Sequence, residues 1–121
     1  MEIQAIGIVR RLEGDWTLLA IDERYREGWD DITVGRKLDV LYWMHELDEE
    51  KRHLLKVHRR GDRSRPTEGV FGLRSPLRPN PIGVTEVEVV RVGHDGLVVS
   101  GLDALEGSPI LDIKSSRRRQ P

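Results

Sequence analysis

The segment from Arg74 to Gly83 reads Arg-Ser-Pro-Leu-Arg-Pro-Asn-Pro-Ile-Gly, and it constrains the backbone more than any other part of the chain. Its three prolines, Pro76, Pro79 and Pro81, fix three φ angles and remove three backbone hydrogen-bond donors. The residues that precede them are pushed away from the α region. This segment, the proline loop (residues 74–83), is therefore expected to be a stiff, irregular loop. It presents two arginines, a serine and an asparagine, which suits a site for a polar ligand.

Most of the remaining chain alternates between apolar and polar residues in short runs, a pattern typical of half-buried strands. The runs are Ile3–Val9, Trp16–Ile21, Leu38–Met44, Leu54–His58, Val70–Leu73, Val84–Val92, Leu97–Ser100 and Ile110–Ile113. His94-Asp95-Gly96 is a hairpin turn signal. Helical patterns are weak. Residues 48–55 are expected to form a turn or two, and residues 22–31 an irregular loop or one short helix.

Six or more short strands separated by Gly, Asp and Pro turns predict an all-β fold. The chain has 121 residues, the size of one domain, and only 5% of them are aromatic. We therefore expect a small single-domain β-barrel with short helical or irregular loops. The run after the proline loop is the longest, and we expect it to be the most central strand.

Composition excludes several classes of function. The chain has no cysteine, which rules out disulfides, iron–sulfur clusters and thiolate zinc sites. Its histidines lack a compact metal-ligand spacing, so no metal is expected; they are His45, His53, His58 and His94. No apolar run approaches the roughly 20 residues needed to cross a bilayer, and the first residues are strand-like, not a signal peptide. A soluble, cytoplasmic protein with no membrane contact is expected.

The formal net charge of −1 hides an asymmetry along the chain. Residues 1–50 hold 13 acidic and 6 basic side chains, whereas residues 51–121 hold 8 acidic and 14 basic ones. Within residues 51–65, seven basic side chains face one acid, Asp62. Such a stripe on a near-neutral protein is suited to docking phosphates. The alternative interpretation is a solvated, partly flexible loop.

The common nucleotide-binding and nucleophile motifs are missing from the sequence: it contains no Gly-x-Gly-x-x-Gly, no Walker loop and no Gly-x-Ser-x-Gly. A second dense segment, residues 101–114, follows a strand and holds two isolated carboxylates, Asp103 and Asp112. Asp103 is open to an Asx-turn, and Asp112 to an ion pair with an arginine or Lys114. Both interpretations are compatible with a binding site.

Several stretches together resemble the TsaA-like family, the family of tRNA methyltransferase O. They are Gly69-Val70-Phe71, the proline loop, Asp103 to Lys114, Ile6 to Val9 and Val40 to His45. The two long motifs occur in the right order, and the resemblance spans nearly the whole chain. Gly72-Leu73 before Arg74 and Leu77 within the loop depart from the family pattern.

The resemblance implies a small β-barrel that dimerises and binds S-adenosylmethionine near the subunit interface. It implies methylation of N6 on N6-threonylcarbamoyladenosine, beside the anticodon of tRNA. Longer members carry a further C-terminal domain, and we expect residues 1–121 to be the barrel domain alone. The alternatives are a non-catalytic nucleotide- or RNA-binding module, or a methyltransferase that acts on a small molecule.

In the light of this resemblance, Arg74 or Arg78 is expected to hold a carboxylate, either of the cofactor or of the substrate. Asn80 and the main chain at Ile82-Gly83 would read an adenine edge, where glycine permits close approach. Asp103 suits an ammonium group or a ribose. The full cofactor-binding set expected is Phe71, Arg74, Ser75, Arg78, Asn80, Pro81, Ile82, Gly83, Asp103, Leu105 and Asp112, with Phe71 and Leu105 as apolar walls.

His45 is the candidate general base, because it follows Tyr42-Trp43 in a motif of the resemblance. The alternative is a strand-end histidine satisfied by a local carbonyl. Basic residues beside the first motif are expected to contact the tRNA backbone. The RNA-binding set expected is Lys56, Arg59, Arg60, Arg63, Arg65 and Lys114.

Overall fold

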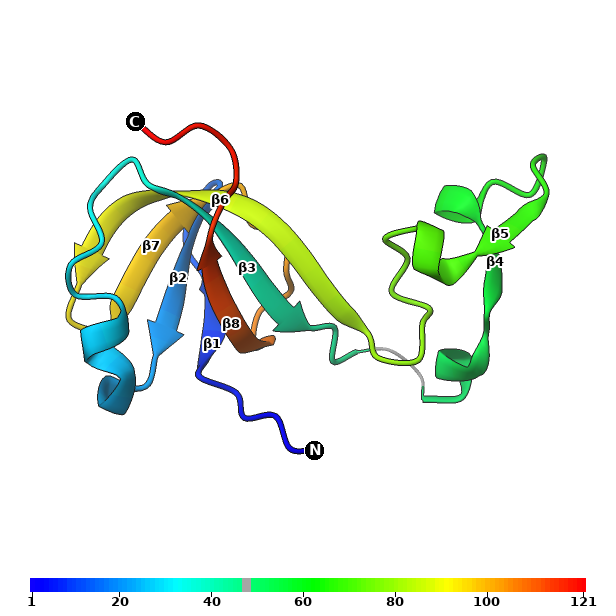
Figure 1. Cartoon of the computed structure of the whole chain (residues 1–121), viewed down its shortest axis with the longest axis horizontal. Helices are drawn as coiled ribbons and strands as arrows, with labels where there is room; N and C mark the ends of the chain where they lie inside the picture. The colour runs from blue at the N-terminus through cyan, green and yellow to red at the C-terminus, as the bar shows by residue number, and fades with distance from the viewer. Residues whose placement is uncertain (47–48) are drawn as a thin grey trace.

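The structure is a computed structural model that describes residues 1–46 and 49–121. Six strands close into an antiparallel barrel in the order β1-β2-β7-β6-β3-β8 (Figure 1). The strands are β1 (Gly7–Arg11), β2 (Trp16–Ile21), β3 (Lys37–Trp43), β6 (Ile82–Gly93), β7 (Gly96–Ser100) and β8 (Pro109–Ser115). The expected small all-β barrel is confirmed. As expected, β6 is the longest of these strands. The expectation that it is the most central strand does not apply, because a closed barrel has no central strand.

The core lies inside the barrel and is aliphatic. Alternate residues of β3 are buried, and Val40 is fully enclosed together with Val9 of β1, Leu19 of β2 and Val89 of β6. A period of two therefore separates the inward and outward faces, as the alternation in the sequence predicts. Between β2 and β3 the chain forms the short 3₁₀ helix η1 (Glu23–Gly28), which matches the expected short helix.

The hairpin between β6 and β7 turns through two residues, His94 and Asp95, and Gly93 pairs with Gly96. Gly96 has a φ of 137°, a conformation that L side chains rarely adopt, so the Asp-Gly signal is confirmed. The strand expected over residues 3–9 begins later, because β1 starts at Gly7. Before it, the Ile6 amide alone bonds to β8, at 2.8 Å from the Ile110 carbonyl.

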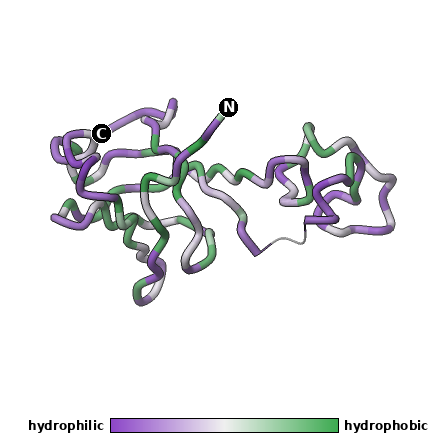
Figure 2. The backbone as a smooth tube through the Cα atoms, turned by 90° about the horizontal axis from the view of Figure 1, so that it is seen from below, coloured by the Kyte–Doolittle hydropathy of each residue, from purple (hydrophilic) through white to green (hydrophobic). Residues whose placement is uncertain are grey.

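A long excursion, residues 44–81, leaves the barrel after β3 and returns at the start of β6 (Figures 1 and 2). It carries its own two-stranded sheet, and Figure 2 shows hydrophobic and hydrophilic stretches mixed along it. Its elements are η2 (Glu49–His53), β4 (Lys56–His58), η3 (Arg59–Gly61), β5 (Thr67–Gly69) and η4 (Val70–Gly72). At its base, the Met44 amide donates to the Pro81 carbonyl at 2.8 Å.

Two expectations for the excursion need correction. Residues 70–73 are not a strand, because the pairing of β5 with β4 ends at Gly69 and the chain then winds into η4, which buries Val70. Residues 54–58 form a strand only from Lys56. The expected turn at 48–55 is the 3₁₀ helix η2 from Glu49 onward, and its first position, Asp48, lies outside the described residues. No helix of the described chain is long and apolar enough to cross a membrane.

Candidate functional site

The proline loop and the segment after β7 meet at one cleft of about 990 Å³. Strands β3 and β6 supply one side of this cleft where they pass into the excursion, through Tyr42 and Thr85. The sequence-predicted residues that line it are Arg74, Arg78, Ile82, Gly83, Asp103 and Leu105. Two motifs that are separate in the sequence therefore form a single candidate site.

Three side chains at the cleft share one hydrogen-bond network. Thr85 Oγ1 donates to Asp103 Oδ1 at 2.8 Å, and the Tyr42 hydroxyl donates to the same oxygen at 3.1 Å. The Tyr42 and Thr85 oxygens lie 3.2 Å apart. Burial raises the pKa of the Tyr42 hydroxyl, and the negative charge of Asp103 raises it further. Tyr42 therefore keeps its proton at neutral pH and acts as a donor.

Gly83 is required by this network. Tyr42 and Gly83 are direct partners across the β3–β6 ladder. A Cβ atom on Gly83 would lie 2.6 Å from Cζ of the Tyr42 ring, well inside contact distance. The expected reason for the glycine was close approach of a ligand, whereas in the structure the tyrosine ring takes the space.

The proline loop is braced by its own polar groups. Nη1 of Arg78 donates to the carbonyls of Leu73 and Ser75, at 2.9 and 3.1 Å. The Ser75 hydroxyl accepts from the Leu77 amide at 3.1 Å. Arg78 therefore holds the loop in shape, which leaves Arg74 as the loop arginine with the freer guanidinium. Arg74 makes one hydrogen bond, from Nη1 to the Val84 carbonyl at 3.2 Å.

Five expected cofactor-binding residues do not line the cleft. Phe71 lies on η4 with 77% of its surface exposed, and Asn80 is also exposed. Pro81 is fully buried, and Ser75 faces a second pocket described below. Asp112 on β8 is exposed and pairs with Lys114 at 3.7 Å, the ion pair that the sequence left open. Their roles toward a cofactor stay predictions.

His45 stands at the edge of the cleft, beside two cleft-lining residues, Glu46 and Ser108. The Ser108 hydroxyl donates to the Leu105 carbonyl at 2.7 Å, and its oxygen lies 3.3 Å from Nδ1 of His45. With the Ser108 proton donated to Leu105, a hydrogen bond between Ser108 and His45 has the ring proton on Nδ1. Nε2 of neutral His45 is then left with a lone pair, 3.9 Å from Glu46 Oε1. The role of His45 as a base stays a prediction.

The loop that carries Asp103 is tied to β1. Glu106 accepts from the Arg11 amide at 2.7 Å and from the Arg10 side chain at 3.0 Å. These two contacts, with the backbone bond first, lower the pKa of the Glu106 carboxyl. The Arg11 side chain also donates to the Leu102 carbonyl. The loop is therefore fixed to the barrel on both sides of Asp103.

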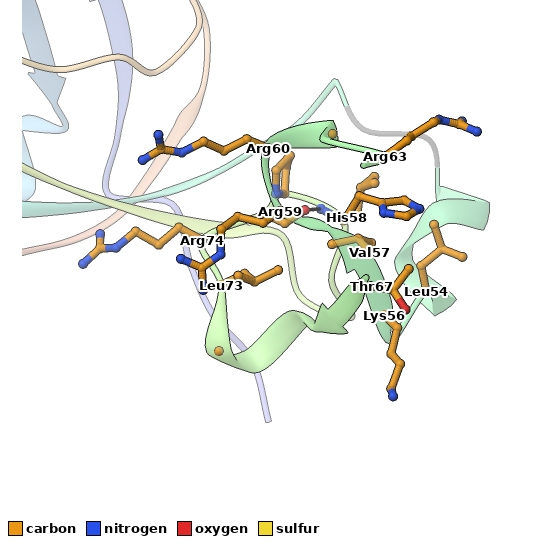
Figure 3. A pocket seen from close by; sticks show the side chains of 15 residues that line it. Leu54, Lys56, Val57, His58, Arg59, Arg60, Arg63, Thr67, Leu73 and Arg74 are labelled. Atoms are coloured by element: carbon orange, nitrogen blue, oxygen red, sulfur yellow. Dashed lines mark hydrogen bonds between the residues drawn. The ribbon is translucent and has the colours of Figure 1, made fainter. Parts of the chain in front are cut away.

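The second pocket lies within the excursion and has a volume of about 810 Å³ (Figure 3). The expected RNA-binding residues Lys56, Arg59, Arg60 and Arg63 line it, and Arg74 lines both this basic pocket and the cleft. Figure 3 shows the side chain of Arg74 extending away from the pocket, on the same side as that of Arg60. Basic pocket and cleft are therefore adjacent.

The arginines of the basic pocket are not equivalent. Arg59 makes a two-pronged ion pair with Glu68, with both contacts at 3.0 Å, which lowers the pKa of Glu68. Arg60 and Arg63 make no hydrogen bond or ion pair with any described residue. Arg60 also has a φ of 52° and is the only described non-glycine residue with a positive φ. Arg60 and Arg63 are thus the arginines free to contact a phosphate.

The two remaining members of the expected RNA-binding set lie outside the basic pocket. The Arg65 carbonyl contacts Nδ1 of His58 at 2.8 Å, and its side chain is not part of the lining. Lys114 lies on the barrel strand β8. Among the described residues, no group of three or more His, Cys, Asp or Glu side chains could hold a metal ion.

Tyr42 and Thr85 are cleft residues that sequence reasoning missed. Both lie on the inward-facing rows of their strands, where Val40 and Val87 continue the core. Hydroxyl groups on an otherwise apolar row are a signal of a polar site at the end of a barrel. That signal is weak without the register, which pairs Tyr42 with Gly83 and places Thr85 two residues further along β6.

The fold and the cleft define a class of protein, a small closed β-barrel with a cleft where a basic excursion leaves two neighbouring strands. A family model for the tRNA-methyltransferase O N-terminal domain matches residues 8–118. The chain belongs to this family, which confirms the TsaA-like resemblance.

Similar curated proteins are named for a cofactor. The chain is 42% identical over 113 residues to a probable S-adenosyl-L-methionine-binding protein of Methanocaldococcus jannaschii, covering 93% of this chain and 89% of the relative. It is 38% identical to the probable S-adenosyl-L-methionine-binding protein VirR of Rhizobium radiobacter, covering 86% and 57%. An S-adenosyl-L-methionine-binding protein of Archaeoglobus fulgidus is 45% identical over 96 residues, with 79% and 66% covered.

Among solved structures, TrmO from Pseudomonas aeruginosa superposes with a TM-score of 0.70 at 22% sequence identity. The match covers 96% of this chain and 55% of that protein. At this identity the likeness shows the fold, and the chain spans about half the length of the solved relative.

Proposed function

We propose that this protein is an S-adenosylmethionine-dependent methyltransferase that methylates N6 of threonylcarbamoyladenosine beside the anticodon of tRNA. The observation that carries the proposal is the single cleft formed by the proline loop and the loop of Asp103. Membership of a tRNA-methyltransferase O family and relatives named for S-adenosylmethionine binding support it. A tRNA substrate would place the protein in the cytoplasm, with residues 1–121 acting as one barrel domain.

The cleft fits S-adenosylmethionine by volume and by chemistry. Its volume of about 990 Å³ is at the upper end of the range of small-molecule sites. Asp103 supplies a carboxylate for an ammonium group or a ribose, and Arg74 supplies donors for a carboxylate. Leu105 and Ile82 supply apolar surface. These residues would hold the cofactor, with Gly83 acting through Tyr42.

The bound cofactor supplies an electrophilic methyl group, so the protein needs no covalent nucleophile. The residues of the chain orient the acceptor amine and exclude water, and alignment alone provides much of the acceleration of such a transfer. His45 takes the proton that N6 loses, at Nε2, since Nδ1 is engaged with Ser108. Glu46 then faces the protonated ring.

The basic pocket would hold the tRNA backbone. Phosphate contacts position a nucleic acid without reading its sequence, so they suit a substrate whose modified base enters a separate cleft. Arg60 and Arg63 are available for phosphates, and Arg74 connects the basic pocket to the cleft. Lys56 also lines the pocket.

A dimer would complete the site. The excursion exposes apolar side chains, with Leu54, Leu55 and Phe71 at 43%, 59% and 77% exposure. Exposed apolar groups gathered on one projecting element are typical of an interaction surface. We propose that a second copy of the chain covers them, which would bring Phe71 to a site near the interface.

Mass spectrometry of nucleosides from tRNA incubated with protein and S-adenosylmethionine tests the reaction. The expected product is threonylcarbamoyladenosine with one additional methyl group. The matched control is tRNA from cells that lack threonylcarbamoyladenosine, which should gain no methyl group. Cofactor binding by calorimetry without any modified nucleoside would contradict the RNA substrate and favour a small-molecule acceptor.

A further inference from the structure

We infer that Tyr42 is a positioning residue that links the proline loop to Asp103 and fixes this carboxylate to receive hydrogen-bond donors of the cofactor. The inference rests on the proposed function for the identity of the ligand. The link itself rests on contacts between Gly83, Tyr42, Thr85 and Asp103.

The first half of the link is steric. The proline loop ends at Gly83, and the Pro81 carbonyl two residues earlier accepts from the amide of Met44, the residue that follows β3. Across the ladder from Gly83, the Tyr42 ring occupies the position of the missing side chain, with Cζ, Cε2 and the hydroxyl oxygen 2.6, 2.7 and 2.9 Å from a Cβ placed there. The position of the loop terminus therefore determines where the ring can lie.

The second half of the link is polar. The Tyr42 and Thr85 hydroxyls each have one proton, and both oxygens lie within hydrogen-bond distance of Oδ1 of Asp103, at 3.1 and 2.8 Å. The second oxygen, Oδ2, accepts no hydrogen bond from any described residue. Asp103 sits on an exposed loop position, where a free carboxylate would rotate. Anchoring one oxygen fixes the direction in which the other can accept, and so prepares the site before the ligand arrives.

The chemistry of Oδ2 selects a donor-rich group. A carboxylate oxygen only accepts hydrogen bonds, and the strongest come from a cation. S-adenosylmethionine carries three kinds of donor: the cationic ammonium of its amino-acid part, the hydroxyls of its ribose and the amino group of its adenine. 5′-Methylthioadenosine keeps the ribose hydroxyls and the adenine amino group and lacks the ammonium, so it separates the ammonium from the donors of the nucleoside.

The test measures the affinity of the full chain for S-adenosylmethionine by calorimetry. Tyr42→Phe keeps the ring and removes the hydroxyl, and we expect it to weaken binding about tenfold, since bonds to a charged group contribute strongly. Thr85→Val removes the other anchor and should weaken binding in the same direction. The matched control is Tyr25→Phe, because the Tyr25 hydroxyl bonds to Gln4 at 3.3 Å, away from the cleft. Its affinity should equal that of the wild type.

A double-mutant cycle shows whether Tyr42 acts through Asp103. In an Asp103→Asn background, Tyr42→Phe should cause almost no further loss, because the carboxylate that it orients is gone. Comparing the Tyr42→Phe effect for S-adenosylmethionine and 5′-methylthioadenosine then identifies the donor. A loss with both ligands points to a donor of the nucleoside, and a loss with S-adenosylmethionine alone points to the ammonium.

The outcomes separate the two proposals. Absence of binding by the wild-type chain overturns the proposed function, and with it the ligand named here. Wild-type binding with undiminished affinity in both Tyr42→Phe and Thr85→Val overturns the positioning role alone. Equal, additive losses in the double-mutant cycle also overturn it. Thermal unfolding of each variant without ligand identifies any loss of affinity that comes from misfolding, and Thr85→Val serves if Tyr42→Phe does not fold.

Discussion

At the scale of single residues, the absence of a side chain at Gly83 determines the shape of the cleft. Gly83 lies in the inward row of β6, which continues through the half-buried Thr85 to the buried Val87 and Val89. Its lack of a Cβ admits the Tyr42 ring, and the ring in turn brings a hydroxyl to Asp103. The smallest residue of the proline loop thus sets the direction of a carboxylate that is distant in sequence.

Replacing Gly83 with alanine should therefore damage both stability and binding. The added methyl group would overlap the Tyr42 ring, and overpacking of this kind costs about 2 kcal/mol of unfolding free energy. Denaturant unfolding measures this cost, and calorimetry should show weakened binding of S-adenosylmethionine. Gly69→Ala is the matched control, since nothing lies within 4 Å of its Cβ position and its φ is −63°. Equal effects of the two substitutions would show that the ring is not held by Gly83.

At this scale the sequence is informative about which residues matter but not about why. The three prolines single out the loop in the sequence. Of the cofactor-binding residues expected from the loop and the second motif together, six line the cleft. The role of Gly83 could not be predicted, because it depends on a partner across the ladder. Likewise, the bonds from Arg78 to its own loop depend on how the chain folds back at Leu73 and Ser75.

At the scale of the elements, the arginines of the excursion differ in whether they already have an ion-pair partner. Arg59 is bound to Glu68 through two contacts, so reversing its charge would leave Glu68 facing a like charge and disturb the β4–β5 sheet. Arg60 and Arg63 make no ion pair with any described residue, and both line the basic pocket. Replacing these two arginines therefore tests the proposed RNA contact without breaking an ion pair of the excursion.

The double variant Arg60→Gln/Arg63→Gln should bind tRNA more weakly and with a flatter salt dependence. Each lost phosphate contact reduces the slope of log affinity against log salt by about 1. Filter binding over a series of salt concentrations measures both quantities. Arg91→Gln is the control, because Arg91 is exposed on β6 outside both pockets. Unchanged affinity and slope in the double variant would mean that the basic pocket is only a solvated loop.

Strand prediction succeeds where strands have barrel partners and fails where they do not. The alternation at Trp16–Ile21 defines β2 to the residue, since both of its neighbours in the barrel demand a buried face. The same kind of pattern at 70–73 forms a 3₁₀ helix, because β5 stops pairing at Gly69. Local periodicity cannot reveal whether a neighbouring strand exists.

For the whole molecule, the exposed apolar side chains of the excursion predict a dimer. Phe71→Glu would place a charge on the surface that we expect a second copy to cover, so the variant should be monomeric. Light scattering after size-exclusion chromatography gives the mass. Val34→Glu is the control, because Val34 is 64% exposed but lies on the barrel side, before β3. A monomeric wild type, or a Phe71→Glu variant that remains dimeric, would contradict this interface.

The hydrogen bonds at the base of the excursion determine how well the barrel tolerates changes in the length and charge of the excursion. Trp43 pairs with Ile82, and the bond from Met44 to Pro81 continues that pairing, so the barrel is joined below the excursion as if by a short turn. The entropic cost of closing a loop grows only with the logarithm of its length, by about 0.6 kcal/mol for each doubling. Residues can therefore be added, removed or recharged beyond this junction at little cost to the barrel. Changes in the excursion would then reach the cleft only through its proline-loop side, which includes Arg74 and Arg78, while Tyr42 and Thr85 stay in place on the barrel strands.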